Sequence, residues 1–158
     1  MASDGFRSIN VDIWEEDVLQ ESDLVEAYHL DGAEAQQEAE GISQQVRGHL
    51  NKGDAPTALS SLLSSPLPYG PSPTLQPAKE SILSTLLVLL NSVKSTEISA
   101  LLKSLDLDQR DTLMKWIYKG LARPELGAGG VLLGWHEKLT EIAGTGCIVR
   151  VMTDRRRV

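Results

Sequence analysis

The sequence contains a single cysteine, Cys147, and no long hydrophobic run. One cysteine excludes an internal disulfide, so we expect a reducing compartment such as the cytoplasm. No stretch reaches the roughly 18 consecutive apolar residues that a membrane-spanning helix requires. The opening residues, MASDGFRSIN, lack the basic and then apolar pattern of a secretory signal. These absences disfavour a secreted, disulfide-stabilised domain and a membrane-spanning protein.

Basic residues are scarce in the N-terminal quarter of the chain. Residues 1–40 contain twelve acidic residues and one base, whereas the remaining residues contain ten acids and fourteen bases. The overall formal charge of −7 disfavours nucleic acid and anionic membranes as partners. The uneven distribution predicts an extended acidic arm over residues 1–33, disordered when free, and a helical body over residues 34–158.

The body shows helical periodicity almost throughout. Apolar residues recur at spacings of three and four in six stretches: 42–50, 58–63, 82–90, 98–102, 113–121 and 131–142. Three of these helices are expected to begin at capping residues, namely Asp54, Ser95 or Thr96, and Asp106 or Asp108. Residues 65–77 contain five prolines and are predicted to form a loop. The segment 146–153 is rich in β-branched residues, which favours a strand, but no second strand is available for pairing, so a helix is expected. The prediction is an all-α fold of about seven helices in antiparallel hairpins, as a small α-solenoid or bundle.

Several residues suggest an enzyme only superficially. His136 is followed by a glutamate, as in zinc proteases, but the position one turn later is Thr140 rather than a second histidine. Cys147 is read more simply as a small buried residue than as a nucleophile. The glycines at 127–130 and 144–146 do not follow a strand and are read as helix breaks. We therefore assign no catalytic, metal or cofactor-binding residues.

The segment LMKWIYKG, residues 113–120, places aromatic residues among lysines. Such a mixture also occurs where single-stranded nucleic acid stacks on a protein. On a helix, however, Lys115 and Lys119 lie on one face, away from the apolar stripe. Trp116 lies beside that stripe, so two alternatives remain open: the edge of the core, or an interface with a partner. Trp135 lies on the stripe of its own helix and is predicted to be core.

Three segments together resemble one family. They are LMKWIYKG (113–120), VLLGWHEKL (131–139) and GCIVRVMTDRRRV (146–158). FRSINVDIWEED (6–17) adds a likeness at the N-terminal end, and the likeness is weakest in residues 18–40 and in the proline-rich loop. They resemble the smallest subunit, subunit 5, of the actin-related protein 2/3 complex, which nucleates branched actin filaments. The chain departs from the animal-like pattern at Trp14 and Trp116, where phenylalanine and tyrosine are expected.

The resemblance implies a non-catalytic structural subunit without cofactors, located in the cytoplasm and cytoskeleton at actin patches or the cell cortex. The helical body would dock on the subunit 4 scaffold near the β-propeller subunit. The arm would tether the actin-related protein 2 subunit, and the complex would contact actin filaments. The expected contact residues of the arm are Phe6, Arg7, Ile9, Val11, Asp12, Ile13 and Trp14. Those of the body are Trp116, Lys119, His136, Arg150 and Arg155.

The arm has a pattern that fits such a role. Ile9, Val11 and Ile13 alternate, so an extended chain would present them on one side. Phe6 and Trp14 are large rings in an otherwise acidic tail and need a surface that buries them. Two alternatives stay open: residues 6–14 pack back on the body, or the chain is a free helical adaptor with an acidic docking peptide and no link to actin.

Overall fold

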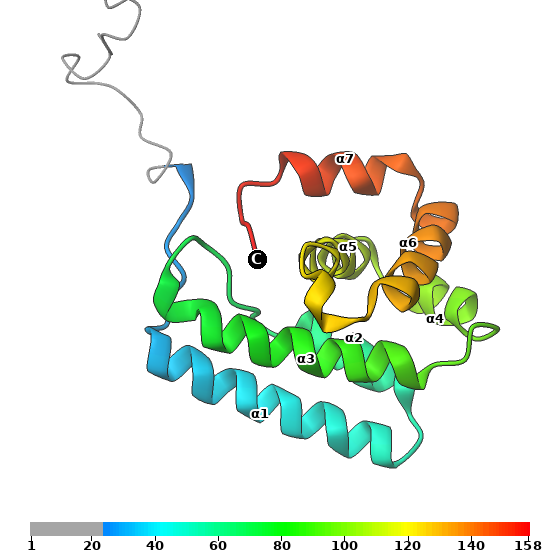
Figure 1. Ribbon diagram of the computed structural model, residues 1–158, viewed down its shortest axis with the longest axis horizontal. Helices are drawn as coiled ribbons and strands as arrows, with labels where there is room; N and C mark the ends of the chain where they lie inside the picture. The colour runs from blue at the N-terminus through cyan, green and yellow to red at the C-terminus, as the bar shows by residue number, and fades with distance from the viewer. Residues whose placement is uncertain (1–23) are drawn as a thin grey trace, which may run out of the picture.

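The computed structural model describes residues 24–158, and this part of the chain is built from seven α-helices without a strand, as Figure 1 shows. The all-α prediction is confirmed. The helices are α1 (Gly32–Asn51), α2 (Ala55–Ser64), α3 (Gln76–Ser92), α4 (Ile98–Ser104), α5 (Leu107–Leu121), α6 (Gly129–Ala143) and α7 (Thr145–Thr153). Two short 3₁₀ turns, η4 (Pro73–Leu75) and η5 (Pro124–Leu126), precede α3 and α6. Within residues 24–158, no helix is both long and apolar enough to cross a membrane.

Aspartate side chains begin three of the helices. Asp31 accepts hydrogen bonds from the backbone N–H groups of the first turn of α1, and Asp54 does the same for α2. Asp106 begins α5 and forms a reciprocal capping box with Gln109. Each cap satisfies backbone donors that have no partner within the helix. The capping role expected for Asp54 is therefore confirmed, and of the two alternatives Asp106 and Asp108 the structure has Asp106 at the cap.

The first three helices form one layer of the molecule. In Figure 1, α1 and α3 run side by side in the same direction, because α2 reverses the chain between them. A buried hydrogen bond of 2.8 Å joins Ser43 of α1 to Thr85 of α3. Each hydroxyl also lies within hydrogen-bond distance of a carbonyl oxygen in its own helix. The hydroxyl that accepts the shared bond donates its single proton to that carbonyl, so neither side chain is left unsatisfied. The bond fixes the position of α1 along α3 in an otherwise apolar contact.

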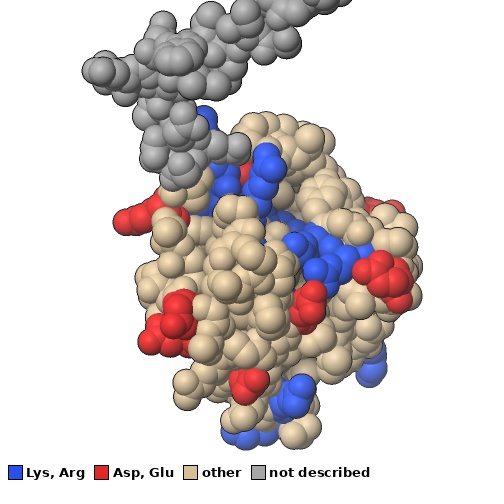
Figure 2. Space-filling view, turned by 60° about the vertical axis from the view of Figure 1, so that its left-hand side comes forward, with Lys and Arg blue, Asp and Glu red and all other residues tan. Residues whose placement is uncertain are grey.

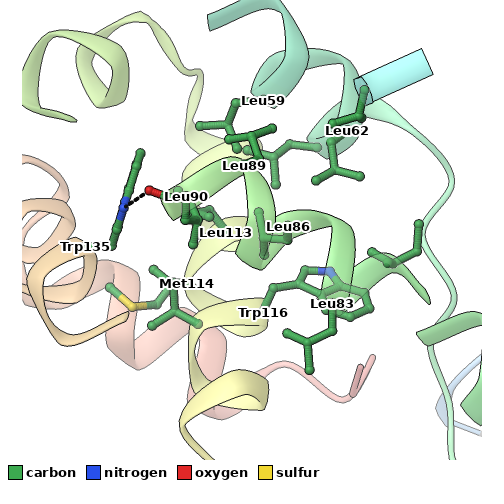
Figure 3. Close-up of a cluster of buried hydrophobic side chains, with 14 of the residues drawn as sticks. Leu59, Leu62, Leu83, Leu86, Leu89, Leu90, Leu113, Met114, Trp116 and Trp135 are labelled. Carbon is green, nitrogen blue, oxygen red and sulfur yellow. Dashed lines mark hydrogen bonds between the residues drawn. The ribbon is translucent and has the colours of Figure 1, made fainter. Parts of the chain in front are cut away.

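The core lies where this layer meets α5 and α6. Helix α3 is apolar nearly all round because α1, α2, α5 and α6 all pack against it. Figure 3 shows Trp116 and Trp135 inserted among the leucines of α2, α3 and α5. Trp135 is 1% exposed and donates a hydrogen bond from Nε1 to the carbonyl oxygen of Leu90, 3.3 Å away. Its predicted place in the core is confirmed.

The structure differs from the sequence predictions at two loops. The proline-rich loop was expected over residues 65–77, but η4 begins at Pro73 and α3 at Gln76, because a proline is well tolerated in a first helical turn. A short helix was expected to start at Ser95 or Thr96, but Glu97 occupies the cap of α4, without a side-chain hydrogen bond.

The segment 146–153 is helical, as expected, despite its β-branched composition. Gly144 separates α6 from α7 with φ of 73°, a left-handed conformation that favours glycine. Helix α7 then folds back over α5 and places Cys147 in the core at 0% exposure. Tertiary contacts therefore outweigh the local strand propensity.

Candidate functional site

The last turns of α5 and the chain that follows α7 enclose a shallow pocket of about 220 Å³. Four basic side chains and one acidic side chain line it, together with three residues whose side chains are uncharged. The lining residues are Lys115, Tyr118, Lys119, Val151, Asp154, Arg156, Arg157 and Val158. We refer to it as the basic pocket. In the view of Figure 2, lysine and arginine side chains gather in a band across the upper part of the molecule, whereas acidic side chains are scattered.

A buried lysine, Lys79 in the first turns of α3, lies close to the pocket. It is 2% exposed, and its ammonium group donates a 2.6 Å hydrogen bond to the carbonyl oxygen of Gly70. Burial, followed by the nearby charge of Lys119, lowers the pKa of Lys79 to about 8. The pKa of Lys119 is also lowered, first by burial and then by Arg123. Among the described residues, neither Lys79 nor Lys119 forms an ion pair with a carboxylate, so positive charge accumulates here.

The proline-rich loop holds the C-terminal segment against the body at one edge of the pocket. The N–H group of Gly70 donates a 2.7 Å hydrogen bond to the carbonyl oxygen of Arg157. The guanidinium of Arg156 lies 5.4 Å from the centre of the Tyr69 ring, within cation–π range. The loop and the C-terminal segment are distant in sequence, and these contacts give the pocket one of its walls.

The same loop also fixes the point at which the N-terminal part of the chain reaches the body. The hydroxyl of Tyr28 donates a 2.7 Å hydrogen bond to the carbonyl oxygen of Pro66. The Tyr28 ring packs edge-on against Tyr69 at 5.4 Å. Desolvation, followed by the charge of Glu38, raises the pKa of the Tyr28 hydroxyl to about 12. The segment that leads into α1 is therefore attached close to the Tyr69–Arg156 edge of the pocket.

Two ion pairs hold the end of the chain on α5. Lys115, half-buried in the pocket, pairs with Asp154 just after α7. One turn earlier, Asp111 accepts two hydrogen bonds from Arg150, 2.5 Å from Nε and 2.8 Å from Nη2. The hydrogen bond from Arg150 lowers the pKa of Asp111. The Asp111–Arg150 pair is bidentate, a geometry that fixes orientation as well as distance.

The structure separates the body residues that were expected to contact a partner. Lys119 lies in the basic pocket, and the ring of His136 forms a 3.0 Å hydrogen bond with Tyr118, which lines the same pocket. Arg155 is exposed after α7, and Arg150 is exposed but paired with Asp111. Trp116 is 0% exposed. Of its two alternatives the structure supports the core, so Trp116 is not retained as a contact residue.

The arm residues expected to contact a partner fall outside the part of the chain that the structure describes. They are Phe6, Arg7, Ile9, Val11, Asp12, Ile13 and Trp14. Their roles remain predictions.

The environment of Cys147 is unlike that of a nucleophile. The thiol is buried, and burial followed by a hydrogen bond with Asp111 raises its pKa to about 12. A reactive cysteine requires a lowered pKa. His136 is engaged with Tyr118 instead. Within residues 24–158, no cluster of three or more histidine, cysteine or acidic residues could hold a metal ion.

Lys79 and Tyr69, which lie beside the basic pocket, were not predicted from the sequence. Lys79 is the only charged residue on the buried side of α3, but nothing local shows that its neighbour is a lysine forty positions later. Tyr69 lies within the proline-rich loop, which was treated as a connection. The visible signal in the sequence was the run of arginines at 155–157, of which Arg155 was predicted to contact a partner.

Comparison with known proteins identifies relatives over almost the whole chain. The family described as the ARP2/3 complex 16 kDa subunit (p16-Arc) matches residues 5–158. The actin-related protein 2/3 complex subunit 5-like protein of Rattus norvegicus is 34% identical over 157 residues, which cover 99% of this chain and 96% of the relative. Subunit 5 of Saccharomyces cerevisiae is 33% identical over 156 residues, covering 97% of both chains. Subunit 5-C of Xenopus laevis is 37% identical over 154 residues, covering 97% of this chain and 94% of the relative.

Proposed function

The chain belongs to the family of 16 kDa subunits of the ARP2/3 complex, and on this basis we propose that it is a non-catalytic structural subunit of that complex. The observation that carries the proposal is the match to named subunits over nearly the full length of both chains. The body docks on the subunit 4 scaffold near the β-propeller subunit, and the arm tethers the actin-related protein 2 subunit. The protein then acts in the cytoplasm and cytoskeleton, at actin patches or the cell cortex.

The surface of the body supports a docking role. Helix α7 exposes Val149 at 58% and Met152 at 77%, and their spacing of three puts them on one face of the helix. Leu133 of α6 is 58% exposed. Covering large apolar side chains at this level of exposure removes their surface from water and so stabilises a complex with a partner. Polar contacts with the partner would come from Arg155, which is exposed, and from Lys119 and His136, which are half-buried.

The energetics of the arm favour a tether over a free ligand. Burying the rings of Phe6 and Trp14 removes about 150–250 Å² each from water, which stabilises the bound state by roughly 4–6 kcal/mol per ring. Ordering about eight residues of backbone costs on the order of 8–16 kcal/mol. The two terms nearly cancel, so the isolated arm binds weakly. Attached to a docked body, it acts at a local concentration of about millimolar, which makes a weak contact effective.

The proposal is tested by deleting residues 1–23 in the assembled complex. The deletion ends before Tyr28, so the contacts of that residue with the proline-rich loop remain. We expect the shortened chain to stay in the complex, the actin-related protein 2 subunit to dissociate more readily, and nucleation to fall. Unchanged retention of that subunit together with unchanged nucleation would contradict the tether.

A matched pair of variants separates side-chain contacts from mere length. Phe6→Ala combined with Trp14→Ala removes both rings, whereas Ser8→Ala combined with Asn10→Ala alters the same stretch without removing apolar area. Only the first pair is expected to loosen the actin-related protein 2 subunit. If both pairs behave alike, the rings do not hold the tether.

A further inference from the structure

The basic pocket has an excess of positive charge that the acidic side chains of residues 24–158 do not balance. Its lining contributes four basic side chains against one acidic side chain, Asp154, which is already paired with Lys115. The buried ammonium of Lys79 and the half-buried one of Lys119 repel each other beside it. Like charges that are close together and partly desolvated repel each other and destabilise the body. A bound anion would offset this repulsion.

The chain itself carries a segment of the matching charge. Residues 15–23 contain five acids and no base: Glu15, Glu16, Asp17, Glu21 and Asp23. Between the acids lie Val18 and Leu19, which suit the apolar part of the pocket formed by Tyr118, Val151 and Val158. Both halves of the complementarity, charge and apolar surface, are therefore present in one polypeptide.

The point of attachment puts this segment within reach. Tyr28 is fixed on Tyr69, and Tyr69 stacks with Arg156 of the pocket wall, each contact spanning 5.4 Å. Residues 24–27 can extend over roughly 14 Å, and the nine residues of 15–23 over about 30 Å. A segment tethered this closely experiences a local concentration of about millimolar, which makes even weak ion pairing occupy the pocket.

We infer that the basic pocket binds the acidic segment 15–23 of the same chain. The occupied pocket anchors the start of the arm on the body and so fixes the direction in which residues 6–14 leave it. This inference goes beyond the proposed tether, because it concerns a contact within the isolated chain and leaves the apolar residues of the arm available to a neighbour.

The test is zero-length carbodiimide cross-linking of the isolated full chain, with the linked residues identified by mass spectrometry. The reagent joins a carboxylate to an amine only where the two are in contact. We expect links from acids 15–23 to Lys119 at least about fivefold more often than to Lys94, although the Lys94 side chain is 81% exposed. Salt at about 0.5 M is expected to abolish this preference, since screening shortens the range of the attraction to a few ångströms. Equal coupling to Lys94 and Lys119 would overturn the inference.

Mixing isotopically light and heavy chains before the reaction separates contacts within a chain from contacts between chains. Links within a single chain are expected; links between light and heavy chains would show that a second copy fills the pocket and would overturn the assignment. A second measurement avoids the cross-linker. Replacing the five acids by their amides is expected to raise the acetylation rate of Lys119 severalfold while leaving Lys94 unchanged, and an unchanged rate at Lys119 would also overturn it.

Failure of this inference can be distinguished from failure of the proposed function. The cross-linking uses the isolated chain, whereas the tether is tested by retention of a neighbouring subunit in the complex. An arm that never touches the basic pocket can still tether a neighbour through Phe6 and Trp14.

Discussion

Helix α7 depends on its contacts with α5, and Asp111→Asn should show how strongly. The helix has only nine residues, and five of them are β-branched: Thr145, Ile148, Val149, Val151 and Thr153. Helices this short are marginal by themselves, and β-branched residues lower helix propensity further. The Asp111–Arg150 pair is one of the contacts that hold α7 in place. Asparagine keeps the size of the side chain but removes its charge.

The expected loss follows from the exposure of the two partners. The side chain of Arg150 is 44% exposed and that of Asp111 is 17% exposed, so water screens the pair only in part. We expect Asp111→Asn to destabilise the closed position of α7 by about 1 kcal/mol. That corresponds to a roughly fivefold rise in the population with α7 open.

Hydrogen exchange of the α7 amides at pH 7 measures this change directly. Exchange in α7 should be about fivefold faster in the variant, while α1 and α3 remain unchanged. Glu97→Gln is the matched control. It removes the carboxylate of the Lys94–Glu97 pair, which lies within a single turn and away from α7, and the Glu97 side chain is 62% exposed. Equal α7 exchange in wild type and Asp111→Asn would refute the reasoning.

The pH dependence of the effect has a definite sign. The pKa of Asp111 lies below its ordinary value of 3.8 in the folded protein, chiefly because of the hydrogen bond from Arg150. A carboxylate with a lowered pKa stabilises the fold above its unfolded pKa and loses that contribution as pH falls through the folded value. The difference between wild type and Asp111→Asn should therefore be constant from pH 5 to pH 7 and shrink as pH falls below about 3.8. A difference that persists unchanged in acid would mean that the charge of Asp111 is not its source.

Three further changes have expected outcomes. Gly120→Ala places a Cβ 2.7 Å from Leu132 Cδ1 and should destabilise the fold by about 1–3 kcal/mol, as measured by urea unfolding. In the same assay Gly134→Ala, whose Cβ meets nothing within 4 Å, should stabilise the fold by about 0.5–1 kcal/mol. The pKa of Lys79 falls from 10.5 to about 8 on folding, so between these pH values the unfolded chain binds more protons than the folded one. As pH rises through this range, the free energy of unfolding of wild type should therefore increase by on the order of 2 kcal/mol relative to that of Lys79→Met. Cys147, with its pKa raised to about 12, should react with an alkylating reagent on the order of 10²-fold or more slowly than free cysteine at pH 8 until the protein unfolds.

Local signals in the sequence were enough to predict most helices. Asp54 and Asp106 mark helix starts because their side chains satisfy backbone donors next to them, an interaction confined to a few residues. The apolar stripe that contains Trp135 identified its buried face in the same way. Trp116 was ambiguous because its position beside the stripe of α5 becomes core only when α3 covers it, as Figure 3 shows.

The basic pocket and the residues beside it could not be predicted, because they come from four separate regions of the chain. Lys79, Lys119, Tyr69 and Arg156 are brought together by the packing of α3 and α5 and by the return of the proline-rich loop to the C-terminal segment. No periodicity or motif connects them. The sequence showed only the excess of basic residues in the body and of acidic residues in the arm, which is the basis of the pairing that we infer.

The measurement that tests the central claim most directly is purification of the tagged chain at its natural level from its own cells, with the co-purifying proteins identified and quantified by mass spectrometry. A structural subunit of the ARP2/3 complex should bring down both actin-related proteins, the β-propeller subunit and the subunit 4 scaffold in equal amounts. A chain of 17.2 kDa recovered without them would contradict the proposal and favour a free helical adaptor.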